Sequence, residues 1–281
     1  MKSLELGNLC ITSLAEIPAF SIPLEILFPD LDYKLLKDLE PINPAIISDG
    51  LIHLTIRSWL LKQSGKIILL DTCVGAEKER PNHHAWHRRS GKKWLKALSK
   101  QGLNPEDVDI VMCTHLHADH VGWNTRLENG YWVPTFPNAQ YLCGRVEYEH
   151  WEHLAKTCDK HGAFTDSVLP IVQRKKMMFV EDGYEICDGL FAKIASGHTP
   201  GHLCLSSKAG AFFCGDVIHS PLQLSFPNIS SAFCVDPKLA STTRKKILSE
   251  IAETNQFLIP AHFPEPGWTK ILKTTSSFQQ I

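Results

Sequence analysis

The chain lacks several features that mark whole classes of protein. It has no run of roughly 18 or more apolar residues, so the sequence predicts no membrane-spanning helix. Its 29 basic and 30 acidic residues leave a net charge of -1, which argues against a nucleic-acid-binding surface. The start, Met1–Gly7, lacks the sustained apolar segment of a secretory signal, which makes a cytoplasmic location the expectation. Internal repeats and low-complexity tracts are also missing.

The nine cysteines include no Cys-x-x-Cys pair, and their total is odd. We therefore expect reduced cysteines that act mostly as small buried hydrophobic residues. Cys73 and Cys113 stand beside candidate ligand loops. Packing is the favoured role for both, and a place near bound metal is the alternative.

The most informative segment is Thr114–His120, which follows the apolar run Val108–Cys113. Its sequence, Thr-His-Leu-His-Ala-Asp-His, holds three imidazoles and one carboxylate. Zinc prefers imidazole nitrogen and carboxylate oxygen in a near-tetrahedral shell, and a catalytic site keeps one position open for water. Such a dense cluster favours a metal site over ordinary surface residues. Its four candidate ligands are His115, His117, Asp119 and His120.

Four ligands cannot complete the shells of two ions, and three later segments offer more. Each candidate follows a short apolar run, as expected if strands deliver ligands to one edge of a sheet. These candidates are His198 in Ser196–His202, Asp216 after Gly215, and His262 after Ala261.

Together these motifs resemble the metallo-β-lactamase superfamily of binuclear metallohydrolases, over about residues 50–265. The resemblance implies a four-layer αββα sandwich and two zinc ions per chain, although iron, manganese or cobalt also suits such ligands. It implies one domain over residues 1–281, with a leader and first strands at 1–50 and a catalytic core at 51–265. By resemblance, His115, His117 and His198 hold one ion, Asp119, His120 and His262 hold the other, and Asp216 bridges them.

Further residues take supporting roles by resemblance or by position. Asp71 matches an early Asp-Thr-Gly segment of the family, with Cys73 in place of glycine, and is expected to orient a ligand. Thr199 and His202 are expected to orient ligands, or else to be ordinary turn residues. The segments 121–125 and 132–137 resemble the subgroup of N-acyl-homoserine lactonase-like and chlorothalonil-hydrolase-like proteins.

Alternation of strands and helices supports a layered α/β protein. We expect helices at 92–101, 145–154 and 237–254, the last with Asp236 as its N-cap and Pro237 at its first position. Short connections predict antiparallel pairing among 191–195, 203–206 and 211–214. The expected strands are 4–12, 53–61, 66–70, 108–113, 140–143, 191–195, 203–206 and 211–214.

The substrate is less clearly encoded. Three aromatic residues downstream of the cluster either wall an apolar pocket or belong to the core: Trp123, Trp132 and Phe136. Asn124 and His219 either donate hydrogen bonds to substrate or stabilise loops. No tyrosine occurs in the late ligand loops, where lactonase-like relatives often place a phenol, which weakens the lactonase hypothesis.

The leading hypothesis is a hydrolase that attacks a lactone or small ester with a metal-bridging hydroxide, in which Asp119 orients the water or accepts its proton. The alternatives are a hydrolytic dehalogenase, an organophosphate or aryl ester hydrolase, and a metal-stabilised binding protein without turnover. The expected partner is a small-molecule substrate.

Two segments keep open roles. The apolar stretch Ile17–Asp30 is expected to pack on its own domain. The alternatives are that it covers the mouth of the active site or docks onto the partner subunit of a homodimer. The basic segment 78–93 is expected to be a solvated loop rather than a rim that steers anions.

Overall fold

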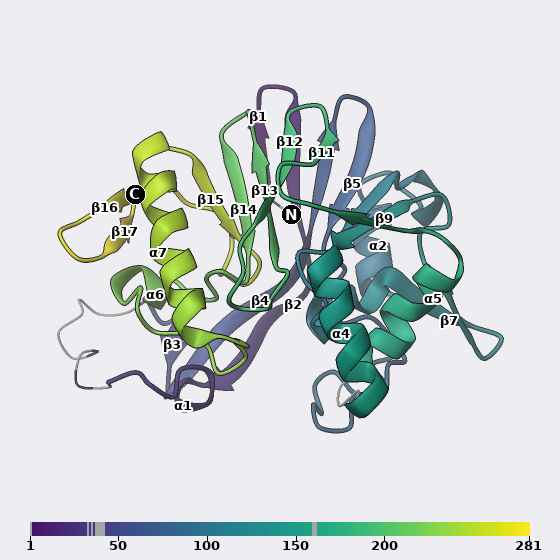
Figure 1. The fold of residues 1–281 in the computed structure, drawn as a ribbon, viewed down its shortest axis with the longest axis horizontal. Helices are drawn as coiled ribbons and strands as arrows, with labels where there is room; N and C mark the ends of the chain where they lie inside the picture. Colours follow the sequence, from purple (N-terminus) through teal and green to yellow (C-terminus); the bar gives the residue numbers. More distant parts are fainter. Residues whose placement is uncertain (1, 33, 35, 37–42, 159–161) are drawn as a thin grey trace.

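The computed structural model of the chain describes residues 2–281 except 33, 35, 37–42 and 159–161. Two β-sheets lie face to face in the centre of the molecule, and helices cover the outer face of each sheet (Figure 1). The result is a four-layer αββα sandwich, as the motifs predicted. The N-terminus lies near the middle of the view, and the C-terminus lies beside the last helix.

The first sheet has eight strands in the order β1-β2-β4-β5-β6-β9-β10, with β3 paired to β4. Its first part is antiparallel, and β5, β6, β9 and β10 run parallel to one another. The strands are β1 (Ser3–Leu6), β2 (Leu9–Pro23), β3 (Ile47–Ser48), β4 (Leu51–Gln63), β5 (Lys66–Leu70), β6 (Ile110–Met112), β9 (Gln140–Gly144) and β10 (Met177–Val180).

The second sheet has five strands in the order β11-β12-β13-β14-β15. The predicted antiparallel pairing of β12, β13 and β14 is confirmed, and β15 runs parallel to β14. The strands are β11 (Glu185–Cys187), β12 (Leu190–Ile194), β13 (Leu203–Ser207), β14 (Ala211–Gly215) and β15 (Phe257–Pro260). Two small hairpins are separate: β7 (Thr125–Glu128) with β8 (Tyr131–Pro134), and β16 (Ile271–Lys273) with β17 (Phe278–Gln280).

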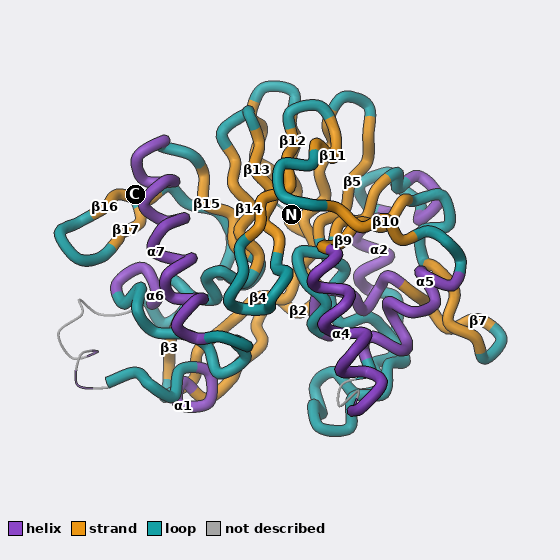
Figure 2. The backbone as a smooth tube through the Cα atoms, in the orientation of Figure 1, coloured by secondary structure: helices purple, strands orange, loops and turns teal. Residues whose placement is uncertain are grey.

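Helices α2, α4 and α5 lie on the side of the first sheet, and α6 and α7 lie on the side of the second (Figure 2). In α7 the Asp236 carboxylate accepts a hydrogen bond from the Leu239 amide at 2.9 Å, so the predicted N-cap is confirmed. The helices are α1 (Leu24–Leu27), α2 (Lys93–Ser99), α3 (Ala118–Val121), α4 (Arg145–Cys158), α5 (Leu169–Gln173), α6 (Leu222–Ser225) and α7 (Pro237–Thr254). Short turns of other helix types are η2 (Pro105–Asp107), η3 (Gly122–Asn124) and η4 (Phe164–Val168).

Alternation along the strands explains why both faces of each sheet are apolar. On β4, Leu60 points into the core between the first sheet and the helices on its outer face. Its neighbours Trp59 and Leu61 point into the core between the two sheets. On β13, Leu205 faces that central core and Cys204 faces the core under α7. Because successive side chains of a strand point to opposite faces, a strand buried on both sides must be apolar throughout.

The direction of the strands places several loops at one edge of the sandwich. β5 and β6 are parallel neighbours, so the segments after Leu70 and Met112 leave the first sheet at the same edge. In the second sheet β12, β14 and β15 share one direction, so the segments after Ile194, Gly215 and Pro260 also emerge together. The candidate ligands of the sequence lie in these loops.

The N-terminal region differs from the expected strand 4–12. A turn at Gly7, whose φ is 60°, divides it into the hairpin of β1 and β2, because glycine adopts the left-handed conformation without strain. β2 then continues to Pro23 along β4, with register shifts on either side of Ile17 that accommodate the proline at 18. The stretch Ile17–Asp30 is therefore part of the first sheet and of a small core beside α1.

The basic segment 78–93 is mostly solvated, as expected, but its first two cations are buried. Lys78 and Arg80 are buried, and both contact the carboxylate of Asp166 in η4. Arg80 binds it through two hydrogen bonds of 2.7 and 3.0 Å, and the Lys78 ammonium lies 3.6 Å from the centre of the Trp132 ring. These cations anchor the segment to the core.

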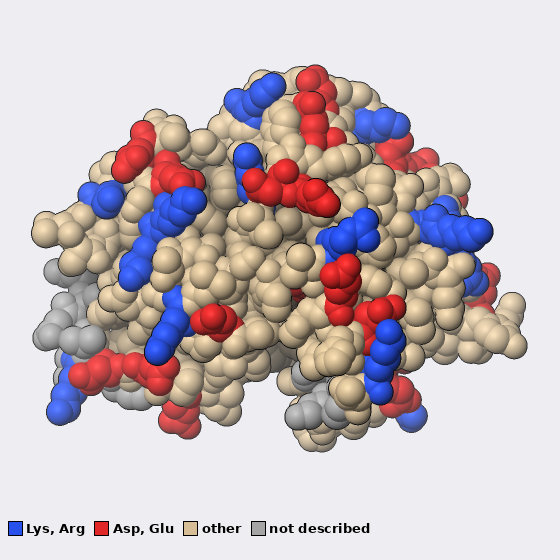
Figure 3. Space-filling view, viewed as in Figure 1, with Lys and Arg blue, Asp and Glu red and all other residues tan. Residues whose placement is uncertain are grey.

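On the face seen in Figure 3, basic and acidic side chains are interspersed, as the near-zero net charge leads one to expect. None of the helices among the described residues combines the length and apolarity needed to cross a lipid bilayer.

Replacement of Asp166 by asparagine tests the buried ion cluster. Asp166→Asn leaves Lys78 and Arg80 buried without their shared counter-charge, so we expect it to lower the free energy of unfolding by about 3 kcal/mol. The matched control is Glu128→Gln in the exposed Arg126–Glu128 pair, for which we expect a change below about 0.5 kcal/mol. Urea unfolding measures both, and equal effects would contradict the anchoring role.

Candidate metal centre

The loops at the common edge bring the candidate ligands of the sequence together from both sheets. His115 and His117 follow β6, and Asp119 and His120 lie on α3, which begins directly after His117. The second sheet contributes the rest from the loops that follow β12, β14 and β15: His198, Asp216 and His262.

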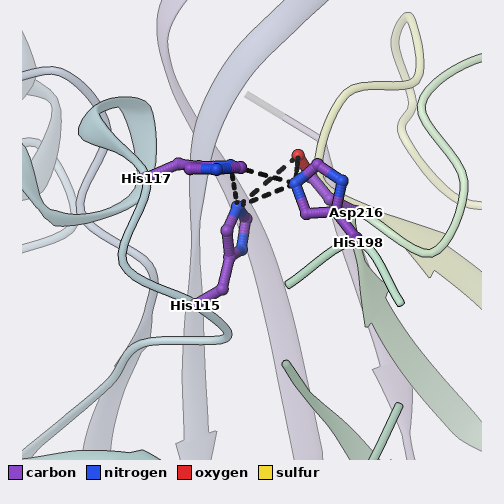
Figure 4. Close-up of side chains that lie close together, drawn as sticks. All are labelled: His115, His117, His198 and Asp216. Carbon is purple, nitrogen blue, oxygen red and sulfur yellow. Dashed lines mark hydrogen bonds and ion pairs between the residues drawn. The ribbon is translucent and has the colours of Figure 1, made fainter. Parts of the chain in front are cut away.

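The first cluster consists of His115, His117, His198 and Asp216, whose ligating atoms all lie within 4.8 Å of one another (Figure 4). His117 Nδ1 lies 2.9 Å from His115 Nε2 and 3.0 Å from His198 Nε2. The two Nε2 atoms are 3.2 Å apart. Three ring nitrogens from two segments, one from each sheet, therefore converge on one point.

The second cluster consists of Asp119, His120 and His262. Asp119 Oδ2 lies 3.7 Å from the Nε2 atoms of both His120 and His262. Asp119 is the most exposed of the three, with 16% of its side chain accessible, whereas the two histidines are buried. The open side of the centre is therefore at Asp119.

Asp216 lies between the clusters and presents one oxygen to each. Its Oδ2 is 3.3 Å from His198 Nε2 and 3.7 Å from His115 Nε2. Its Oδ1 is 3.0 Å from His262 Nε2 and 3.4 Å from His120 Nε2. This is the arrangement that a carboxylate needs in order to bridge two ions.

The distal nitrogens of the histidines face hydrogen-bond partners outside the clusters. His120 Nδ1 lies 2.9 Å from Asp71 Oδ2, and His262 Nδ1 lies 3.0 Å from the carbonyl oxygen of Thr55. Since both oxygens only accept, each Nδ1 carries a proton, and this hydrogen bond directs Nε2 toward the centre. His115 Nδ1 and His198 Nδ1 face Thr114 Oγ1 at 3.1 Å and Cys234 Sγ at 3.5 Å.

Burial sets the charge states within the first cluster. Burial holds the pKa of His198 well below its usual value, although Asp216 opposes this, so the imidazole is neutral. Burial and the neighbouring histidines lower the pKa of His115 in the same way. For His120 burial acts in the same direction, but Asp216, Asp71 and Asp119 outweigh it and raise its pKa well above the usual value.

The donor set fits divalent cations. His120 Nε2 and Asp216 Oδ1 are buried and have no hydrogen-bond partner in the described chain. The ring nitrogens of His115, His117 and His198 lie 2.9 to 3.2 Å from one another with an oxygen of Asp216 beside them, so one cation at this point would satisfy all four groups. Nitrogen and carboxylate ligands of this number suit two transition-metal ions.

The supporting residues expected from the sequence lie around these clusters. Asp71, at φ 58°, accepts hydrogen bonds from the amide and hydroxyl of Thr114 and also contacts His120. His202 accepts a hydrogen bond at 3.1 Å from the amide of Asp216, and so orients the backbone of that residue. Thr199 is buried, and its hydroxyl lies beside Glu147 without regular hydrogen-bond geometry.

For four of the five candidate substrate contacts, the packing favours the alternative role in the core or in a loop. Trp123 stacks on Trp94 in the core, and Phe136 packs edge-on against the same ring. Trp132 covers the Lys78 ammonium. Asn124 is buried and accepts a hydrogen bond from the Thr72 hydroxyl, so it stabilises the loop. A sequence pattern cannot distinguish a pocket aromatic from a core aromatic, because both follow the same apolar spacing.

His219 is the substrate candidate that does lie at the centre. Its Nε2 is 3.3 Å from Asp216 Oδ2, and its ring is stacked at 18° on that of His262. Both ring nitrogens are buried and make no hydrogen bond within the described chain. His219 therefore places a buried ring nitrogen beside the carboxylate that lies between the clusters.

Sequence analysis missed Cys234 and Glu147. Cys234 contacts His198 from 36 positions away, and no local motif surrounds it. Glu147 is buried and accepts hydrogen bonds from the amides of Leu116 and Gly201. The available signal in the sequence was an acidic residue, Glu147, in the first turn of a predicted helix that directly follows an apolar strand. The eight cysteines whose side chains are described are free thiols, and Cys73 and Cys113 pack in the core.

Comparison with known proteins agrees with this geometry. The sequence model of the metallo-beta-lactamase superfamily matches residues 53–262. The N-acyl homoserine lactonase AiiA of Bacillus thuringiensis subsp. kurstaki is 22% identical over 246 residues, covering 82% of this chain and 89% of that protein. An N-acyl homoserine lactonase of Bacillus sp is 26% identical over 247 residues, with the same coverage.

Solved structures show the same fold. AidC, a dizinc quorum-quenching lactonase in complex with a product, N-hexnoyl-L-homoserine, superposes with a TM-score of 0.81 at 22% identity, over 100% of this chain and 96% of that one. The hydrolase AbOPH of the beta lactamase superfamily superposes with a TM-score of 0.80 at 24% identity, over 99% and 96%.

Replacement of Asp71 by asparagine tests the support of the second cluster. Asparagine tolerates the positive φ but gives His120 no carboxylate, so we expect one of two bound ions to bind about 10- to 100-fold more weakly. Competition with a chromophoric chelator measures both dissociation constants. Two unchanged constants would show that Asp71 does not support the site.

Proposed function

The chain belongs to the metallo-β-lactamase superfamily, and we propose that it is a dinuclear zinc hydrolase that opens lactones or cleaves related small esters. The observation that carries the proposal is the pair of ligand clusters joined by Asp216, with one carboxylate oxygen toward each. Its relatives include N-acyl homoserine lactonases, and a dizinc lactonase shares its fold. We further propose that residues 1–281 act as one catalytic domain, since both sheets contribute candidate ligands.

Bound ions would be held by His115, His117 and His198 in the first cluster, by Asp119, His120 and His262 in the second, and by Asp216 in both. A pair of zinc ions there supplies Lewis acidity, which activates water near neutral pH and polarises the carbonyl of an ester. The thiols near the centre are poor nucleophiles, because burial raises the pKa of Cys234, which contacts His198, and of Cys73 and Cys113.

The reaction itself is the addition of water to the ester. The water oxygen bonds to the carbonyl carbon, the ring carbon–oxygen bond breaks, and the proton from water ends on the alkoxide that leaves, which gives a hydroxy acid. Asp119 is the partly exposed carboxylate of the centre and is suited to accept that proton and pass it on. His219 is suited to hold the carbonyl oxygen through a ring N–H.

A substrate panel tests the proposed activity. Protein loaded with zinc, with metal content measured on the same sample, is assayed against N-acyl homoserine lactones, an aryl ester, an organophosphate triester and a chlorinated aromatic nitrile. We expect two ions per chain and lactone turnover. His117→Ala and Asp216→Asn should each reduce kcat/KM about 10³-fold or more, because each removes a ligand of the Lewis acid.

Other outcomes of the panel decide between the alternatives. Preference for the triester or the nitrile would replace the lactonase proposal with an organophosphate hydrolase or a dehalogenase. Two bound ions without turnover of any substrate would leave a metal-stabilised binding protein. Full activity of either variant would contradict the metal mechanism itself.

His219→Phe tests the proposed hydrogen bond to substrate. Phenylalanine keeps the ring that stacks on His262 but has no N–H, so we expect kcat to fall about 10²-fold with two ions still bound. The exposed His153, replaced in the same way, is the control and should keep full activity. If His219→Phe loses an ion instead, His219 is a ligand. If it keeps its kcat, His219 has no part in the reaction.

A further inference from the structure

Glu147 lies in the first turn of α4, outside both ligand clusters, yet its carboxylate contacts two of the loops that carry ligands. Its Oε1 accepts a hydrogen bond of 3.0 Å from the amide of Leu116, the residue between His115 and His117. Its Oε2 accepts a hydrogen bond of 3.1 Å from the amide of Gly201, three residues after His198. One side chain therefore connects the loop after β6 to the loop after β12.

The carboxylate has a third partner at the edge of the centre. Trp151, one turn further along α4, donates its indole N–H to Glu147 Oε1 at 2.7 Å. The Trp151 ring packs edge-on against the ring of His117 at a centroid distance of 5.2 Å. Glu147 thus also fixes the aromatic side chain that limits the movement of His117, the least buried histidine of the first cluster.

Close backbone packing makes this connection specific. A side chain on Gly201 would place its Cβ 2.1 Å from the amide nitrogen of Glu147, and one on Gly144 would lie 2.7 Å from the carbonyl oxygen of Gly201. The first turn of α4 therefore contacts the backbone of the His198 loop directly. Only glycine at both positions lets the carboxylate reach the Gly201 amide.

The setting of Glu147 suggests a role beyond filling space. The side chain is fully buried and forms no ion pair with any described residue. An uncompensated buried carboxylate is costly unless its oxygens are satisfied, and here every hydrogen-bond partner belongs to a ligand loop or to a residue that contacts a ligand. The Leu203 amide, at the start of β13, also donates a hydrogen bond of 2.8 Å to the carbonyl of Thr114.

We propose that Glu147 is a positioning residue that sets the distance between the His115–His117 pair and His198, and thereby the metal affinity of the first cluster alone. The inference rests on the metal site proposed above. Asp71 has the corresponding task for the second cluster, through His120. Asp71 reaches the first cluster only indirectly, through the Thr114 hydroxyl beside His115, so each support has its main effect on a different ion.

Glu147→Gln is the decisive variant. The carbonyl oxygen of glutamine can still accept the hydrogen bonds from Leu116 and Trp151. Its NH₂ group then faces the N–H of Gly201, so the amide of the His198 loop loses its hydrogen-bond acceptor. We expect one ion to bind about 10- to 100-fold more weakly and the other to change by less than about threefold. Stepwise competition with a chelator gives the dissociation constants of both ions. Asp71→Asn should mainly weaken the ion of the second cluster, and comparison of the two variants therefore assigns each constant to its cluster.

Three controls separate the possible causes. Glu149→Gln, an exposed position on the same helix, should bind both ions as wild type does. Trp151→Phe keeps the ring against His117 but loses the indole N–H, so we expect less than a threefold effect. If it weakens binding as much as Glu147→Gln, the loss comes from the indole and the proposal is overturned. Equal weakening of both ions by Glu147→Gln would also overturn it.

Hydrogen exchange in the unaltered chain keeps the proposal testable if Glu147→Gln does not fold. The Leu116 and Gly201 amides should remain protected in protein stripped of metal, because the carboxylate and not an ion holds them. Exchange at the rate of open loops would overturn the proposal. A wild-type chain that binds no metal at all would instead refute the proposed function, so the two failures are distinguishable.

Discussion

The buried carboxylate of Asp216 is the group around which the candidate centre is organised. It is surrounded by five imidazoles from the segments that follow β6, β12, β14 and β15, and each of its oxygens faces a different cluster. Burial alone would raise the pKa of this carboxyl, but His262, His120 and His219 hold it well below its usual value. Asp216 is therefore ionised in an interior where charge is costly, and divalent cations are the natural counter-charge.

The rest of the site shows how such a concentration of polar groups is kept in place. Each inward-facing nitrogen depends on a partner behind it: Asp71 behind His120, the Thr55 carbonyl behind His262, and Cys234 behind His198. The partners are chemically different, from a carboxylate to a thiol, so ions held by the two clusters would meet imidazoles of different basicity. Gly215 is needed because the side chain of His202 packs directly against its backbone. Its φ is 50°, and an added Cβ would lie 2.6 Å from His202 Nε2.

Local patterns identified more of the site than of its surroundings. The run from His115 to His120 is short, and its chemistry is visible without a fold. The later His198, Asp216 and His262 were found because each follows an apolar strand, and the parallel order of β12, β14 and β15 makes strand ends converge. The pattern failed where burial decides the role. Trp123 and Phe136 have the composition of a pocket wall but pack on Trp94, and Lys78 and Arg80 belong to a basic run but point into the core.

By itself, the sequence determined the alternation of strands and helices, the α7 helix with its cap at Asp236, and the candidate metal ligands, because each of these follows from a local pattern of a few residues. Only the tertiary structure decided that Glu147 connects two ligand loops, that Cys234 stands behind His198, and that His219 lies against Asp216. Those contacts join residues of different loops and layers, and the packing of two sheets, rather than any local preference, sets the distances between them.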